Sequence, residues 1–194
     1  HRRPRFPAPV RAAVAIYGLD AVGVVPHMIF LVDFVARGLG RGMAAGAACW
    51  IAFGLGAMLG PSLAGAVADR IGFRLALRLM LLVEAVMVAV PLASAAPAAL
   101  LASAVIVGAF TLGIVPLTLG RIYTVLPPGS ERARAAWGSA TIAWAVGQAA
   151  AAQAFSFVFA RSGSYLLLFG IGTGAVLVAL AVDLLQRNGA PAST

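Results

Sequence analysis

The stretch that decides the fold is Gly65-Ala-Val-Ala-Asp69-Arg70-Ile-Gly72-Phe-Arg74, which lies between two long apolar segments. With Arg78, about one helical turn further on, it combines one acid, three bases and two glycines. The sequence on either side of it is almost free of charge. A compact charged turn between two apolar helices is typical of a loop at a membrane surface, and the composition of the whole chain favours the same interpretation.

The 194-residue chain has the composition of a membrane protein. Hydrophobic residues make up 62% and charged residues 10% of it, and its mean hydropathy is +0.99. A soluble domain carries about a quarter charged residues. A spanning helix needs about 20 mostly apolar residues, so this length allows about six spans with short loops. We therefore expect an all-α membrane protein, a bundle of six transmembrane helices in contact with the lipid bilayer.

Several other classes of protein are disfavoured. The net charge is +8, but all 14 basic residues are arginines that lie mostly in turns between apolar runs, which argues against a nucleic-acid partner. Arginine without lysine, with much Ala and Gly, suggests a bacterial source. The single Cys49 cannot form an internal disulfide or a cysteine metal cluster. With His1 and His27 as the two histidines, we expect no metal and no cofactor.

We also expect no enzyme. Neither Gly54-x-Gly56 nor Gly170-x-Gly172 follows a strand, so neither is a dinucleotide loop. A membrane metalloprotease would need His-Glu-x-x-His, which the sequence does not contain. An intramembrane serine protease needs a base paired with its serine, and Ser139 has no histidine at comparable depth.

Apolar runs separated by glycine and proline predict the six helices and their orientation. The expected helices cover residues 11–35, 43–68, 74–95, 98–120, 134–160 and 164–186. Eleven arginines fall on one side and three on the other, which places both termini in the cytoplasm of a multi-pass protein of the bacterial inner membrane. The eleven are Arg2, Arg3, Arg5, Arg11, Arg70, Arg74, Arg78, Arg121, Arg132, Arg134 and Arg187, and the three are Arg37, Arg41 and Arg161.

Small residues recur at helix-packing intervals within the expected spans. They are Gly42 and Gly46, Gly56 and Gly60, and the cluster Gly170, Gly172 and Gly174. In lipid, helices associate where small residues let their backbones approach closely. We expect most of these glycines to pack helices together.

The charged turn resembles the signature of the major facilitator superfamily, which lies between the second and third helices of a six-helix half. One departure is Phe73, where a basic residue is common. The resemblance implies a secondary active transporter (a permease, working as symporter, antiporter or efflux system) that moves a small-molecule substrate by alternating access. It also implies a gating latch, with a solvated turn that only sets topology as the alternative. The gating residues would be Gly65, Asp69, Arg70, Gly72, Arg74, Arg78 and Arg121.

The start of the chain also bears on its organisation. It begins with His1 instead of Met and is rich in Arg and Pro, like the loop that joins the two halves of such transporters. We expect residues 1–10 to be a cytoplasmic linker, 11–186 the six-helix bundle and 187–194 a cytoplasmic tail. The favoured interpretation is the C-terminal half of a twelve-helix protein. A free-standing half that dimerises is the alternative, and in both cases a second six-helix half is a partner.

The chemistry of the turn itself leads to local expectations. Gly72 can take the positive φ that ends a tight turn. Asp69 can accept hydrogen bonds from the first amides of the third helix, where its charge also suits the helix dipole. Arg70, Arg74 and Arg78 would hold the turn at the cytoplasmic surface.

Two carboxyls within the spans are the sharpest candidates for function. Asp20 lies nine residues past Arg11 and Glu84 ten past Arg74, so both sit roughly 14–15 Å inside the boundary, near the middle of a hydrocarbon core about 30 Å thick. Ionisable groups there are costly and mark functional sites. One interpretation is proton coupling as access alternates, and the other is a permanently protonated acid that is hydrogen-bonded within the bundle.

Further polar residues extend this candidate site. His27 lies two turns beyond Asp20, either as a proton relay or as a structural hydrogen-bonding group. On the fifth helix Thr141, Trp144 and Gln148 share a face suited to binding a small organic solute, or else to helix–helix hydrogen bonding. Other expectations are that Trp137 and Gln153 flank this face, Thr111 joins the cavity, Asp33 pairs with Arg37, and Tyr17 and Tyr123 mark bilayer interfaces.

The leading hypothesis is therefore a small-solute transporter with protons as a possible coupling ion. The alternative is a non-transporting membrane scaffold or receptor that keeps the same helical frame. The two differ in whether activity depends on Asp20 and Glu84.

Overall fold

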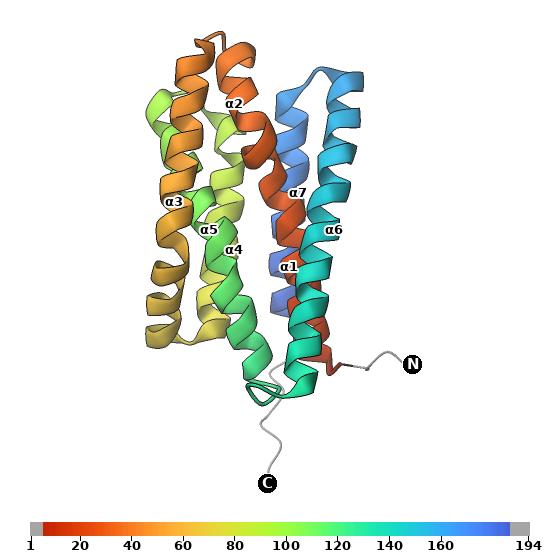
Figure 1. Cartoon of the computed structure of the whole chain (residues 1–194). Coiled ribbons are helices and arrows are strands. Elements are labelled where there is room, and N and C mark those ends of the chain that lie inside the picture. Colours follow the sequence, from red (N-terminus) through yellow and green to blue (C-terminus); the bar gives the residue numbers. More distant parts are fainter. Residues whose placement is uncertain (1–5, 187–194) are drawn as a thin grey trace.

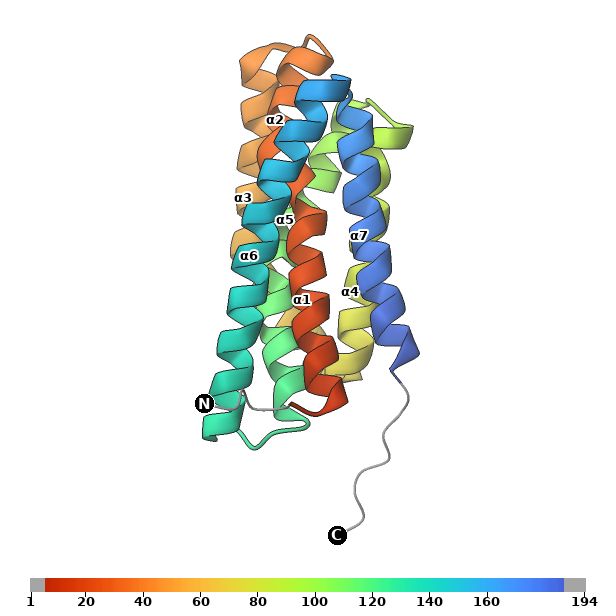
Figure 2. The same cartoon turned by 90° about the vertical axis from the view of Figure 1, so that its right-hand side faces the viewer.

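The computed structural model describes residues 6–186, and every regular element within them is a helix. Six helical segments of this part are long and apolar enough to cross a membrane. They lie side by side in one bundle (Figures 1 and 2). The predicted fold class, an all-α membrane protein with six spanning helices, is therefore confirmed.

The first span is continuous from residue 8 to residue 38 but changes its helical pitch twice. It consists of α1 (Ala8–Val25), η1 (Pro26–Phe30), α2 (Leu31–Asp33) and η2 (Phe34–Gly38), where η1 and η2 are π-helical. Pro26 has no amide hydrogen to donate, and the wider turn begins at this residue. Such π-helical turns occur frequently at functional sites, and η1 carries His27.

The five remaining spans are α3 (Gly42–Ile71), α4 (Phe73–Ala93), α5 (Pro97–Tyr123), α6 (Glu131–Ser162) and α7 (Tyr165–Leu185). Several bounds differ from those predicted. α1 begins inside the segment 1–10 that we expected to be a linker, because Pro9 is tolerated in a first helical turn. α6 begins three residues early because the Ser130 side chain caps it by accepting from the Ala133 amide. Residues 1–5 and the expected tail 187–194 lie outside the described residues.

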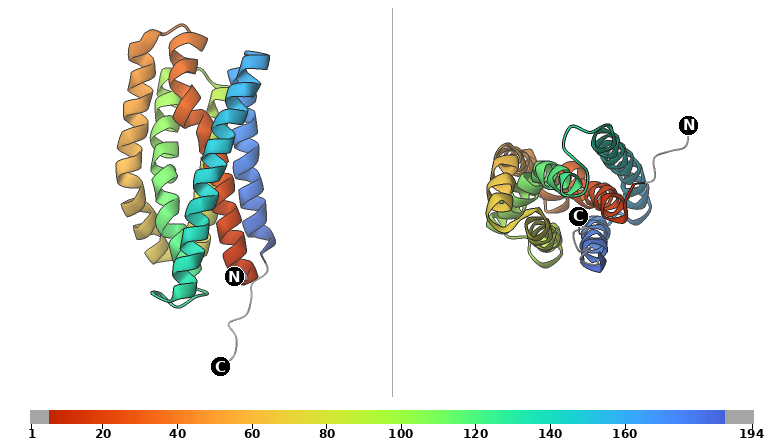
Figure 3. Two further views of the ribbon diagram at one scale, coloured as in Figure 1. Left: turned by 45° about the vertical axis from the view of Figure 1, so that its right-hand side comes forward. Right: turned by 90° about the horizontal axis from the view of Figure 1, so that it is seen from below.

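The two ends of the bundle carry different parts of the chain. One end of the bundle carries the start of α1, the end of α7, the turn between α3 and α4 and the loop between α5 and α6 (Figure 1). We call it the terminal end. The other connections lie at the opposite end, which we call the far end. Figure 3 (right) looks along the helices from the terminal end.

Close backbone contact between α3 and α5 holds one side of the bundle together. A β-carbon at Gly56 would lie 1.9 Å from the carbonyl oxygen of Val105, and one at Gly60 would lie 1.9 Å from that of Ala109. These two glycines therefore pack helices as predicted. The prediction is wrong for Gly170 and Gly174, where an added β-carbon would meet no described atom within 4 Å.

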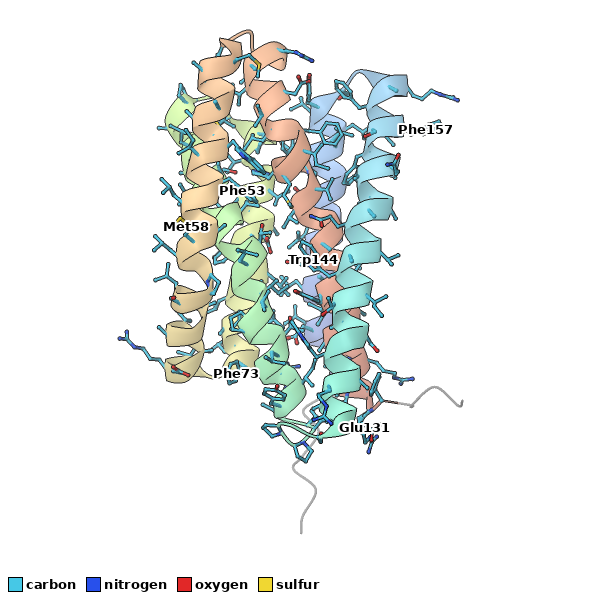
Figure 4. All side chains as sticks on the ribbon, in the orientation of Figure 1. Phe53, Met58, Phe73, Glu131, Trp144 and Phe157 are labelled. Carbon is cyan, nitrogen blue, oxygen red and sulfur yellow. The ribbon has the colours of Figure 1, made fainter. Side chains whose placement is uncertain are left out.

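The outer surface of the described bundle is apolar. Met58 is 78% exposed and points away from the bundle on α3 (Figure 4), and many other large aliphatic side chains are similarly exposed. A soluble protein rarely exposes so much apolar surface, whereas a lipid-facing surface requires it. Among the six spans, α6 is the least buried. These features indicate a multi-pass membrane protein.

Candidate functional site

Two carboxyls meet in the interior of the bundle. Asp20 of α1 and Glu84 of α4 are both fully buried, with 0% of each residue exposed. The two groups are close enough to interact with one another. However, none of their four oxygens has regular hydrogen-bond geometry with a partner in residues 6–186. The sequence predicted this pair from depth alone, and the structure brings the two residues together.

Aromatic side chains from α1 and α6 line the side of Asp20. The Tyr17 ring packs against Trp137 at 5.8 Å and against Trp144 at 6.0 Å between ring centroids, with interplanar angles of 33° and 34°. Trp144 lies at mid-height on the side of α6 that faces α1 (Figure 4) and interacts with Asp20. Its buried indole nitrogen has no hydrogen-bond acceptor of regular geometry among the described residues. Tyr17 is buried, so the prediction that it marks a bilayer interface is wrong.

His27 is part of a hydrogen-bonded chain that links three helices. Its Nε2 lies 2.6 Å from Ser103 Oγ, and that hydroxyl donates to the Met87 carbonyl at 2.7 Å. Because the Ser103 hydrogen is directed to Met87, the hydroxyl is left to accept from His27, so Nε2 carries the imidazole hydrogen. Nδ1 of the neutral ring is then an acceptor, and it has no donor within residues 6–186. His27 is 1% exposed.

Three other predicted polar residues contribute less to this site. The hydroxyls of Thr111 and Thr141 donate to the carbonyls of Val107 and Trp137, each one turn back in its own helix. Thr141 is also exposed on α6. Gln148 reaches across to the first span, where its amide nitrogen lies 3.0 Å from the sulfur of Met28 in η1. The predicted face of α6 is therefore only partly directed inward.

The charged turn has part of its predicted geometry. Gly72 has φ 82° and ψ 150°, which confirms the positive φ that was expected. The first turn of α4 has no side-chain cap, so the prediction that Asp69 caps this helix is wrong; Asp69 and Arg70 are exposed instead. Phe73, the departure from the family pattern, lies at the terminal end of α4 (Figure 4), and its ring covers Gly120 of α5 closely enough to exclude a β-carbon there.

A buried carboxylate, that of Asp183, forms ion pairs with Arg78 and Arg121 at the terminal end. Asp183 of α7 is 0% exposed and accepts from Arg78 Nε at 2.6 Å and from an Arg121 guanidinium nitrogen at 3.2 Å. Arg74 donates to the backbone carbonyl of Gln186. These arginines therefore join α4 and α5 to the end of α7, and Arg74 and Arg78 turn toward α7 instead of toward the surface of the turn.

Sequence reasoning missed Asp183, Ser103 and the interior position of Tyr17. Asp183 had a detectable signal, since it is the one acid in the last apolar run and lies near the end at which most of the arginines gather. Ser103 had none, because a lone serine in an apolar helix commonly bonds its own helix. At the far end, the predicted ion pair of Asp33 with Arg37 is confirmed at 3.1 Å, and Tyr165 also donates to Asp33.

The described residues show no group of three or more His, Cys, Asp and Glu side chains placed to hold a metal ion. Six apolar spans, a charged turn after the second and two carboxyls buried inside the bundle describe a multi-pass membrane protein with ionisable groups in its interior. A family model described as "Uncharacterised MFS-type transporter YbfB" matches residues 1–184, so the chain belongs to this family of major facilitator superfamily transporters. None of the curated proteins compared with the chain matches it significantly. Membership in a transporter family points to transport and not to catalysis.

Proposed function

We propose that the protein is a proton-coupled secondary transporter that moves a small organic solute across the bacterial inner membrane. The observation that carries the proposal is the pair Asp20 and Glu84, two fully buried carboxyls on different helices without regular hydrogen-bond partners in the described residues. Placing an ionisable group inside a bilayer costs free energy, so two buried acids are not expected where apolar side chains would pack as well. A role in binding and releasing a proton in each transport cycle would explain why both acids are buried.

In this proposal the two carboxyls share a proton in one access state and release it in the other. Two negative charges at close range in a medium of low polarity repel strongly, so the pair holds one proton whenever no other cation is near. Opening the pair to water on one side would lower that repulsion and let the proton leave.

The orientation follows from the arginines. We propose that the terminal end faces the cytoplasm, since seven described arginines lie there and three lie at the far end. They are Arg11, Arg70, Arg74, Arg78, Arg121, Arg132 and Arg134 at the terminal end, and Arg37, Arg41 and Arg161 at the far end. Both termini would then be cytoplasmic.

The turn between α3 and α4 would act as the gating latch. Asp69 and Arg70 are exposed, and neither makes an ion pair with another described residue. They are therefore available to a second six-helix half, from the same polypeptide or from a second copy. The cluster at Asp183 would keep α4, α5 and α7 moving as one body while that contact forms and breaks. Gly72, with its positive φ, shapes the turn, and Gly65 lies in the preceding turns of α3.

Proton flux in liposomes tests the proposal. The purified protein is reconstituted around a trapped pH-sensitive dye, and an organic cation, a neutral solute and an organic anion are added in turn. We expect at least one of them to move protons in the wild type, and this flux to be absent in Glu84→Gln and Asp20→Asn. The matched control is Asp33→Asn at the far end, which should keep the flux. A solute-driven flux that survives Glu84→Gln and Asp20→Asn would show that the pair does not couple transport to protons. No flux with any solute would favour the scaffold or receptor hypothesis.

A further inference from the structure

Most of the buried polar atoms that lack a hydrogen bond of regular geometry in the described residues are acceptors. The described interior holds four carboxyl oxygens, from Asp20 and Glu84, and the Nδ1 atom of His27, all buried and without a regular donor. The one buried donor that lacks a partner near them is the indole nitrogen of Trp144. Buried polar groups normally have hydrogen-bond partners. An excess of buried acceptors over donors therefore favours a ligand that donates hydrogen bonds.

No positive side chain of residues 6–186 balances this interior. The interactions that act on Asp20 and Glu84 come from one another and from Trp144, with no arginine among them. The arginine nearest to Glu84 along α4 is Arg78, and its guanidinium is bound to Asp183 at 2.6 Å. The interior is therefore electronegative, whereas the arginines that bind carboxylate lie at its terminal end.

The aromatic neighbours of Asp20 fit a positive ligand as well. Aromatic faces attract a cation that lies within about 6 Å of the ring centre, and tryptophan is the strongest of them. Tyr17 and Trp144, which pack against each other, both interact with Asp20. Trp144 is half-buried on α6, the least buried of the spans, and its side chain interacts with Asp20.

We propose that the cargo is an organic cation, an ammonium that carries an aromatic or aliphatic body, and that it exchanges with the proton of the Asp20–Glu84 pair. The ammonium donates to the carboxyl oxygens, its body lies against Trp144, and the shared proton leaves as the cation arrives. One positive charge enters for each one that leaves, so the charge of the site stays constant. An anion would be repelled by the two carboxyls and would find no positive partner beside them. A neutral analogue could not compensate the negative charge that remains on Asp20 and Glu84 once their shared proton has left. This inference rests on the proposed function and adds the chemical class of its cargo.

Binding to the purified protein tests the class of cargo without requiring transport. Three probes share one ring and nearly one size: phenethylammonium as the cation, 2-phenylethanol as the neutral form and phenylacetate as the anion. Binding is followed by tryptophan fluorescence, and proton release by a dye in weakly buffered detergent solution. We expect the cation alone to bind saturably and to release about one proton per site. Removing one member of a buried charge pair at an interface typically weakens binding by roughly 30-fold or more.

Asp20→Asn and Glu84→Gln should each produce a loss of that size and abolish the proton release. Asp33→Asn, at an acid outside the site, should change neither. Trp144→Phe keeps an aromatic face and both carboxyls, so it should weaken binding by a smaller factor and keep the proton release. Helix content by circular dichroism checks that each variant is folded. If one acid variant does not fold, the other acid variant and Trp144→Phe still test whether the cation binds at the pair.

Equal or tighter binding of phenylacetate or 2-phenylethanol, or unchanged binding of phenethylammonium in a folded Asp20→Asn or Glu84→Gln protein, would overturn the inference. So would the absence of saturable phenethylammonium binding to the wild type. These outcomes differ from failure of the proposed function. A protein that moves protons with a neutral or anionic solute is a transporter with another cargo, and one that binds phenethylammonium without any flux binds the cation but does not transport it.

Discussion

Replacing Asp183 with asparagine should be among the most damaging single changes in the bundle. The side chain is fully buried and accepts from Arg78 at 2.6 Å and from Arg121 at 3.2 Å. The Asp183→Asn substitution would keep the shape of the side chain but remove its charge, and would leave two guanidinium groups without their counter-ion. Removing one partner of a buried ion pair costs about 3–5 kcal/mol.

The expected cost lies at the lower end of that range. The Arg78 side chain is 27% exposed and that of Arg121 is 12% exposed, so part of their charge can be solvated after the substitution. We therefore expect the free energy of unfolding to fall by about 3 kcal/mol, which changes the unfolding equilibrium by more than about 100-fold. The control is Asp33→Asn, whose partner Arg37 is 76% exposed and whose loss should cost about 0–1 kcal/mol.

The assay is denaturant unfolding of the purified protein in mild detergent, followed by helical circular dichroism. A second variant isolates the cause: Leu at all three positions, Arg78, Asp183 and Arg121, removes the uncompensated charge together with the pair. Such apolar replacements are often neutral or stabilising, so the triple variant should unfold closer to the wild type than Asp183→Asn does. Equal stabilities of the Asp183→Asn and Asp33→Asn proteins would show that the buried ion pairs of Asp183 do not stabilise the bundle. A triple variant as unstable as Asp183→Asn would show that the uncompensated arginine charge is not the cause of the loss.

Two further predictions concern glycines and have matched controls in neighbouring positions. Gly56→Leu should destabilise the bundle by about 3 kcal/mol or more, because a β-carbon there lies 1.9 Å from the Val105 carbonyl, whereas Gly54→Leu meets no described atom within 4 Å of its β-carbon and should be tolerated. Detergent thermal stability decides this, and equal losses would contradict the close α3–α5 packing. Gly72→Ala should cost roughly 1–3 kcal/mol because φ is 82° and ψ is 150°. Gly65→Ala, within α3 and in open space, should cost less than that, and the reverse order in the same assay would show that the turn has another conformation.

The spans and the buried carboxyls were predictable because a bilayer imposes simple rules. Length and hydropathy locate helices, and a fixed rise per residue converts sequence distance into depth, which placed Asp20 and Glu84 at the same level. The turn was recognisable because its charges and glycines stand out against apolar neighbours. These properties are local in sequence, or depend on position along a single axis.

The direction in which each side chain points was not predictable. Depth does not fix rotation about the helix axis, so Tyr17 was placed at an interface although it packs against two tryptophans. The same uncertainty hid the pairing of Asp183 with Arg78, which are 105 residues apart in the chain. Gly170 and Gly174 were misjudged for the same reason. Small residues are needed only on a helix face that contacts another helix, and these two glycines lie on a face that contacts none of the described helices.

The coupling of solute movement to protons by the buried pair on α1 and α4 can be tested in liposomes. The measurement is the solute-driven proton flux of the wild type, Asp20→Asn, Glu84→Gln and Asp33→Asn. We expect flux in the wild type and in Asp33→Asn and none in the other two. Flux of equal size in all four proteins would contradict this coupling.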